Sequence, residues 1–66
     1  MDPKEIFELI VKADEKLKYA NDANGDLRRQ QAIALLEQAR DAAREAGIEA
    51  IAVQAETRLA DLGAQS

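Results

Sequence analysis

The chain has 66 residues, enough for one small domain with a thin core, so we expect a single domain over residues 1–66. Nine basic and thirteen acidic side chains give a formal net charge of -4, which repels phosphate backbones and argues against nucleic-acid binding. Histidine and cysteine are absent, which removes the commonest general base, metal ligand and thiolate nucleophile, so we expect no enzyme, metal site or cofactor.

The amino terminus carries a helix-start signal. Asp2 is able to cap the first amides, Pro3 suits the first helical position, and Glu5 follows the cap by three residues. Apolar residues then recur at steps of three and four, which predicts a helix over about residues 3–21. Its predicted core-facing residues are Ile6, Leu9, Ile10, Ala13, Leu17 and Ala20.

Residues 21–26 are rich in turn formers and predict a loop. We expect Gly25 to adopt a positive φ and Asp26 to cap the helix that follows. The alternating oxygen-bearing side chains of this loop resemble the start of a calcium-binding EF-hand loop. Leu27 and Ile33, however, stand where such a loop needs a glycine and a bidentate glutamate, so we expect a turn and no calcium.

Two further helices are predicted, over about residues 27–46 and 48–62. Gly47 between them suits a left-handed cap, and Ile48 would make the hydrophobic contact that accompanies it, which reverses the chain within a few residues. The core-facing residues expected in the second helix are Ala32, Leu35, Leu36, Ala39, Ala42, Ala43 and Ala46. Those expected in the third are Ile48, Ile51, Ala55, Leu59 and Leu62. The sequence therefore predicts an all-α fold, a small antiparallel three-helix bundle.

The spacing of Ala32, Leu36 and Ala39 resembles the second helix of a tetratricopeptide repeat. The segment 58–63 is similar to the leucine and small-residue portion of the first helix of such a repeat, so the resemblance spans about Ala32 to Gly63. It implies tetratricopeptide-like helix packing in a module that binds other proteins. An isolated three-helix module, similar in size to microtubule-interacting and trafficking domains, is the alternative comparison.

Several apolar and basic residues fall outside the predicted core-facing stripes. Phe7 and Val11 lie one turn apart on the first helix, and Ile33 lies among arginines on one face of the second. The arginines and Ile33 together suit an acidic, partly hydrophobic segment. The alternatives are that scattered surface apolar residues are normal and that Glu37 pairs with Arg40 on a solvated face. The candidate partner-binding residues are Phe7, Val11, Arg29, Ile33, Arg40 and Arg44.

These observations predict a protein-protein interaction module without catalytic activity. A partner helix or peptide would dock on the first and second helices. The alternative is a self-associating structural or engineered bundle, a homo-oligomer that buries the same apolar residues against identical subunits. The chain lacks both a run of roughly 20 apolar residues and a secretory signal, so we expect a soluble, cytoplasmic protein without membrane contact.

Overall fold

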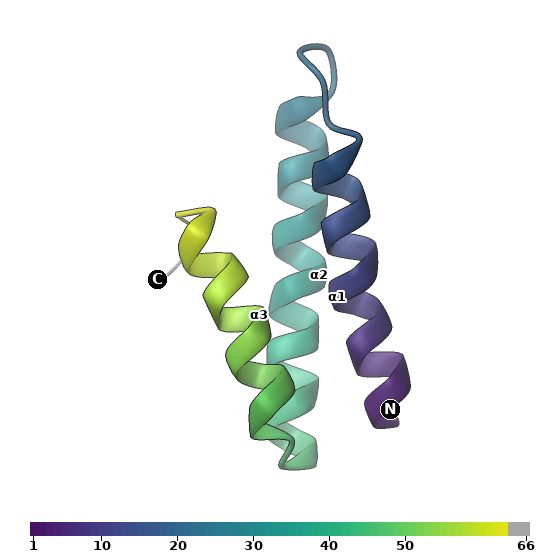
Figure 1. Ribbon diagram of the computed structural model, residues 1–66, viewed down its shortest axis with the longest axis vertical. Helices are drawn as coiled ribbons and strands as arrows, with labels where there is room; N and C mark the ends of the chain where they lie inside the picture. Colours follow the sequence, from purple (N-terminus) through teal and green to yellow (C-terminus); the bar gives the residue numbers. More distant parts are fainter. Residues whose placement is uncertain (64–66) are drawn as a thin grey trace.

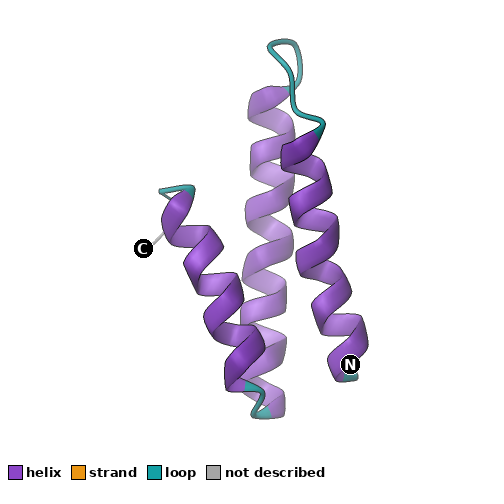
Figure 2. Ribbon diagram, in the orientation of Figure 1, coloured by secondary structure: helices purple, strands orange, loops and turns teal. Residues whose placement is uncertain are grey.

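The computed structural model describes residues 1–63, which form three α-helices (Figure 1). They are α1 (Pro3–Lys18), α2 (Gly25–Ala46) and α3 (Glu49–Asp61), and each runs antiparallel to the helix before it. Within the described residues there is no strand, and loops occupy only the two connections and the ends of the chain (Figure 2). The predicted all-α, antiparallel three-helix bundle is confirmed.

The central element is α2, the longest helix. Both α1 and α3 pack on the same side of α2, whereas their contact with each other is slight (Figure 1). The molecule measures 38 × 23 × 13 Å, so it is thin along one axis. This arrangement leaves the opposite side of α2 and the outer edges of α1 and α3 open to solvent.

The start of α1 agrees with the sequence, but its end comes earlier than predicted. An Asp2 carboxylate oxygen accepts a 2.9 Å hydrogen bond from the amide of Glu5, as expected for an N-cap. The helix ends at Lys18 rather than near residue 21, because the Asn21 side chain accepts hydrogen bonds from the amides of Ala23 and Asn24. Such local bonds compete with helix formation.

The prediction for the start of α2 is wrong in two respects. Gly25 is the first helical residue and does not have a positive φ, so the helix begins two residues earlier than predicted. Asn24, not Asp26, occupies the cap position, and its side chain accepts a 2.9 Å hydrogen bond from the amide of Asn21. The two asparagines therefore close the loop upon itself, and no side chain caps the first amides of α2.

The turn between α2 and α3 has the predicted form. Gly47 adopts a left-handed conformation, with φ 75° and ψ 25°. Its amide donates to Arg44 O over 3.1 Å, and the amide of Ile48 donates to Ala43 O over 2.8 Å. These two bonds define a Schellman motif, which satisfies carbonyl groups at the end of α2. Ile48 belongs to this turn, so α3 begins at Glu49 and ends at Asp61, one residue inside each predicted boundary.

The same substitution at two glycines is expected to change stability in opposite directions. Replacing Gly25 by alanine should raise the free energy of unfolding by about 0.5–1 kcal/mol, because the residue is helical and an added Cβ meets no neighbour. Replacing Gly47 by alanine should lower it by about 1 kcal/mol or more, because φ is positive there. Thermal and urea unfolding followed by circular dichroism would measure both changes. Changes of the same sign at the two positions would contradict the helical conformation of Gly25 or the left-handed conformation of Gly47.

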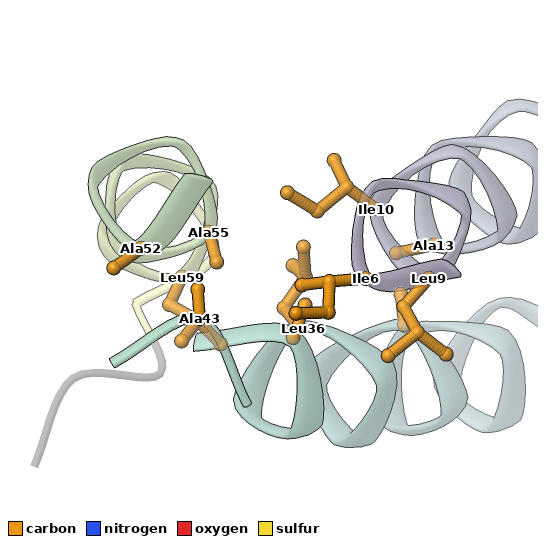
Figure 3. Close-up of a cluster of buried hydrophobic side chains, with 11 residues drawn as sticks. Ile6, Leu9, Ile10, Ala13, Leu36, Ala43, Ala52, Ala55 and Leu59 are labelled. Atoms are coloured by element: carbon orange, nitrogen blue, oxygen red, sulfur yellow. The ribbon is translucent and has the colours of Figure 1, made fainter. Parts of the chain in front are cut away.

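Alanine supplies much of the core. Six of the eleven buried apolar residues among residues 1–63 are alanines, which allows the helices to approach closely. Leu36 projects from α2 between the side chains of α1 and α3 (Figure 3). The buried residues are Ile6, Leu9, Ile10, Ala13, Ala32, Leu36, Ala39, Ala43, Ala52, Ala55 and Leu59.

The edges of the predicted core-facing stripes are less buried than expected. Ala20 and Ala46 are exposed, since Ala20 lies beyond the end of α1 and Ala46 ends α2. Partly buried members of the stripes are Leu17, Leu35, Ala42, Ile48, Ile51 and Leu62. Ala52 is fully buried although it was not predicted, because it precedes the buried Leu59 by seven residues and so shares its side of α3.

Candidate interaction site

Phe7 and Val11 form an exposed apolar patch on α1, which we call the α1 patch. Their exposed fractions are 43% and 40%. Asp14 continues the same helical stripe, and its carboxylate accepts hydrogen bonds from Arg58 of α3, with Nε–Oδ1 3.0 Å and Nη2–Oδ2 3.2 Å. Because residues at i, i+4 and i+7 share one side of a helix, the α1 patch lies on the edge of α1 that borders α3.

The predicted site residues of α2 also lie along one stripe, but they make contacts with other residues of the same chain. Arg29 donates a hydrogen bond to Leu62 O at the end of α3, and Arg44 pairs with Glu56 of α3. Ile33 is half-buried and packs against the core. This arginine stripe, comprising Arg29, Ile33, Arg40 and Arg44, therefore follows the seam between α2 and α3.

Arg40 has its partner on its own helix. Its Nε donates a 2.9 Å hydrogen bond to Oδ1 of the adjacent Asp41. This hydrogen bond raises the pKa of the Arg40 guanidinium above its usual value, and the negative charges of Asp41 and Glu37 add to the effect. Since arginine is already charged throughout the ordinary pH range, the shift introduces no pH dependence there. The positive charge of the Arg40 guanidinium is thus partly balanced by the acidic side chains beside it.

The six predicted residues do not form one continuous surface. On α3, Glu56 faces Arg44 of α2, whereas Arg58 faces Asp14 of α1. Residues two positions apart in a helix point about 200° apart, so these two ion pairs lie on opposite sides of α3. The α1 patch and the arginine stripe are consequently separated by α3. Of the six predicted residues, only Phe7 and Val11 form an exposed apolar pair.

Four other large apolar side chains are exposed and were not among the six predicted site residues. They are Met1 at 61%, Tyr19 at 62%, Leu27 at 58% and Val53 at 49%. Tyr19 and Leu27 flank the loop between α1 and α2, and the Tyr19 ring lies 5.6 Å from the Lys18 ammonium. Sequence periodicity did not single out Leu27 because the predicted start of the second helix fell on it, although it is the third residue of α2.

The described residues carry no arrangement suited to metal binding or membrane insertion. Within residues 1–63 no three acidic side chains converge closely enough to hold a metal ion. None of the three helices is long and apolar enough to cross a bilayer.

Comparison with known proteins adds no further constraint on the site. No family model, curated protein or solved structure matches this chain. The class that the fold defines is a small all-α, three-helix domain. The resemblance of residues 32–63 to a tetratricopeptide repeat stays a prediction.

Proposed function

We propose that this chain is a small protein-interaction module that acts in the cytoplasm without chemistry of its own. A partner helix or short peptide docks on the α1 patch, next to the edge of α3. The observation that carries the proposal is the exposure of Phe7 and Val11, at 43% and 40%, beside a core that is complete without them. Adjacent large apolar residues on a small soluble domain are typical of contact surfaces.

The surroundings of the α1 patch indicate what kind of segment would bind. The Asp14–Arg58 pair borders the patch at one end and is partly exposed, so it offers both charges at the rim of an apolar centre. An amphipathic helix with apolar residues spaced by three or four would place them on Phe7 and Val11. The arginine stripe lies beyond α3, and its internal hydrogen bonds and ion pairs reduce its capacity to hold the same segment.

The test compares the wild-type chain with a double variant, Phe7→Gln and Val11→Gln. Because glutamine favours helices and both positions are exposed, we expect the free energy of unfolding to change by about 1 kcal/mol or less. Peptides selected from a displayed library against the wild type should bind the double variant at least about tenfold more weakly. Amide shifts on peptide binding should concentrate around Phe7, Val11 and the facing edge of α3.

Val53→Gln is the matched control, since Val53 is comparably exposed on α3 but outside the patch. Peptide affinity should be unchanged in this variant. Failure to select any peptide that distinguishes the wild type from the double variant would overturn the proposal. Unfolding of the double variant would do so as well, because it would place Phe7 and Val11 in the core. If the wild-type chain self-associates and the double variant does not, the patch is a contact between identical copies.

A further inference from the structure

Two hollows lie along the seam between α1 and α2. The loop-end hollow has a volume of about 380 Å³ and is lined by Lys12, Glu15, Lys16, Tyr19, Arg28 and Leu35. The Met1-end hollow has a volume of about 370 Å³ and is lined by Met1, Ala42, Glu45 and Ala46. None of these lining residues belongs to α3, so this surface, which we call the α1/α2 seam, is distinct from the α1 patch and the arginine stripe.

The loop-end hollow is basic on a chain whose net charge is -4. Three of its lining side chains are cationic, Lys12, Lys16 and Arg28, and Glu15 is the single acidic one. The Nε of Arg28 is buried and has no hydrogen-bond partner within the described residues. A buried donor without an acceptor is costly, and a carboxylate would satisfy it with a charge-assisted hydrogen bond. The hollow therefore suits an acidic side chain.

The Met1-end hollow offers the complementary features. Glu45 is exposed at its rim, and the small side chains of Ala42 and Ala46 leave room for a larger apolar group. Such a group protrudes at the other end of the seam, where Leu27 is 58% exposed. One end of the seam thus offers a cationic hollow and the exposed Leu27, and the other end offers the exposed Glu45 and an alanine-lined hollow.

The spacing along α2 relates the two ends by symmetry. Gln31 and Glu45 are 14 residues apart, or about 21 Å along the helix, and Gln38 lies midway between them. The three residues are seven apart, so they share one side of α2. A two-fold axis at Gln38 would place the residues around 45 of one copy against those around 31 of the other, close to Arg28 and Leu35.

From this complementarity we infer that the α1/α2 seam is a self-association surface, on which two copies of the chain pair with their α2 helices antiparallel. Glu45 of each copy enters the loop-end hollow of the other and meets Lys12 and Arg28. Leu27 packs on Ala46 in the Met1-end hollow. The interface is the same patch on both copies, so the assembly closes as a dimer. It leaves Phe7 and Val11 exposed, so this inference and the proposed function stand or fall separately.

Charge reversal and its rescue test the dimer. Sedimentation equilibrium should show a monomer–dimer equilibrium for the wild type, and Glu45→Lys or Lys12→Glu alone should weaken dimerisation at least about tenfold. The double variant that carries both changes should regain part of the lost dimerisation, because the charges at positions 12 and 45 are exchanged while Arg28 stays cationic. Asp61→Lys is the control for Glu45→Lys, since it makes the same change in net charge on α3 and should leave the dimer intact. Circular dichroism verifies that each variant is folded.

Cysteine cross-linking tests the position of the two-fold axis independently of charge. The chain has no cysteine of its own, so Gln38→Cys introduces a single thiol. A residue at the axis faces the same residue of the other copy, so this variant should oxidise to a disulfide-linked dimer. Gln54→Cys on α3 should form little disulfide. A wild-type chain that stays monomeric at millimolar concentration would overturn the inference. So would a double charge variant as weak as the single ones, or equal cross-linking at the two cysteine positions.

Discussion

Replacement of Leu36 by alanine is expected to lower the free energy of unfolding by about 2–5 kcal/mol, the range for removing a buried leucine. Leu36 is fully buried in α2 and packs between α1 and α3, so its loss opens a cavity within a cluster to which all three helices contribute side chains (Figure 3). A domain of this size has a total stability of roughly 3–10 kcal/mol. The substitution therefore removes a large part of what holds the fold together.

Urea and thermal unfolding followed by circular dichroism would measure this loss. At roughly 4–8 °C per kcal/mol for a domain of this size, Tm should fall by at least about 8 °C. Leu27→Ala is the control, because it makes the same chemical change in the same helix at a residue that is 58% exposed. The comparison is made at a protein concentration where the chain is monomeric, since Leu27 also lies in the proposed dimer interface. Equal losses for the two variants would contradict the central position of Leu36.

Replacement of Ala39 by leucine is expected to lower the free energy of unfolding by about 1–3 kcal/mol through overpacking. Ala39 is fully buried on α2, and a core in which alanines allow close helix approach has little room for additional carbons. The extra side chain must push a neighbouring helix outward or adopt a strained rotamer. This result is opposite to the one expected if larger apolar residues simply added hydrophobic burial.

The comparison variant is Ala60→Leu, which makes the same change at an exposed position of α3. Its stability should remain within about 0.5 kcal/mol of the wild type, because it meets no packed neighbour. Chemical unfolding gives both values, and amide chemical shifts should move across the α2 contacts only for the Ala39 variant. A stabilised Ala39 variant would mean that the helices are not closely packed at this point.

The thin shape of the molecule relates the fold to both proposals. Since α1 and α3 pack on one side of α2 and make little contact with each other, the edges of α1 and α3 that border each other also stay partly uncovered. The α1 patch lies on the edge of α1 that borders α3. The hollows of the α1/α2 seam are lined by residues that do not belong to α3. A domain of 66 residues can thus present two separate surfaces, one for a foreign segment and one for a second copy.

The amino-acid pattern was enough to predict the three helices, their antiparallel order and most of the core. These features depend on local signals, such as the Asp2 cap, the left-handed Gly47 and apolar steps of three and four residues. The loop was harder to predict because Asn21, Asn24 and Asp26 are all able to cap or turn the chain. Such competing local hydrogen bonds differ little in energy. The prediction placed the helix cap at Asp26, whereas in the structure the side chains of Asn21 and Asn24 form the hydrogen bonds of the loop.

Which side of each helix meets which neighbour could be read only from the packing of the three helices. Helical periodicity gives the direction of a side chain relative to its own helix axis, but not the helix that lies in that direction. Asp14 and Arg58 are 44 residues apart, and their pairing places the α1 patch beside α3. The Arg44–Glu56 pair likewise turns the arginine stripe toward α3 and away from the α1 patch. The loop-end hollow is lined by residues from α1, α2 and Tyr19 between them, so it exists only once the two helices are packed together.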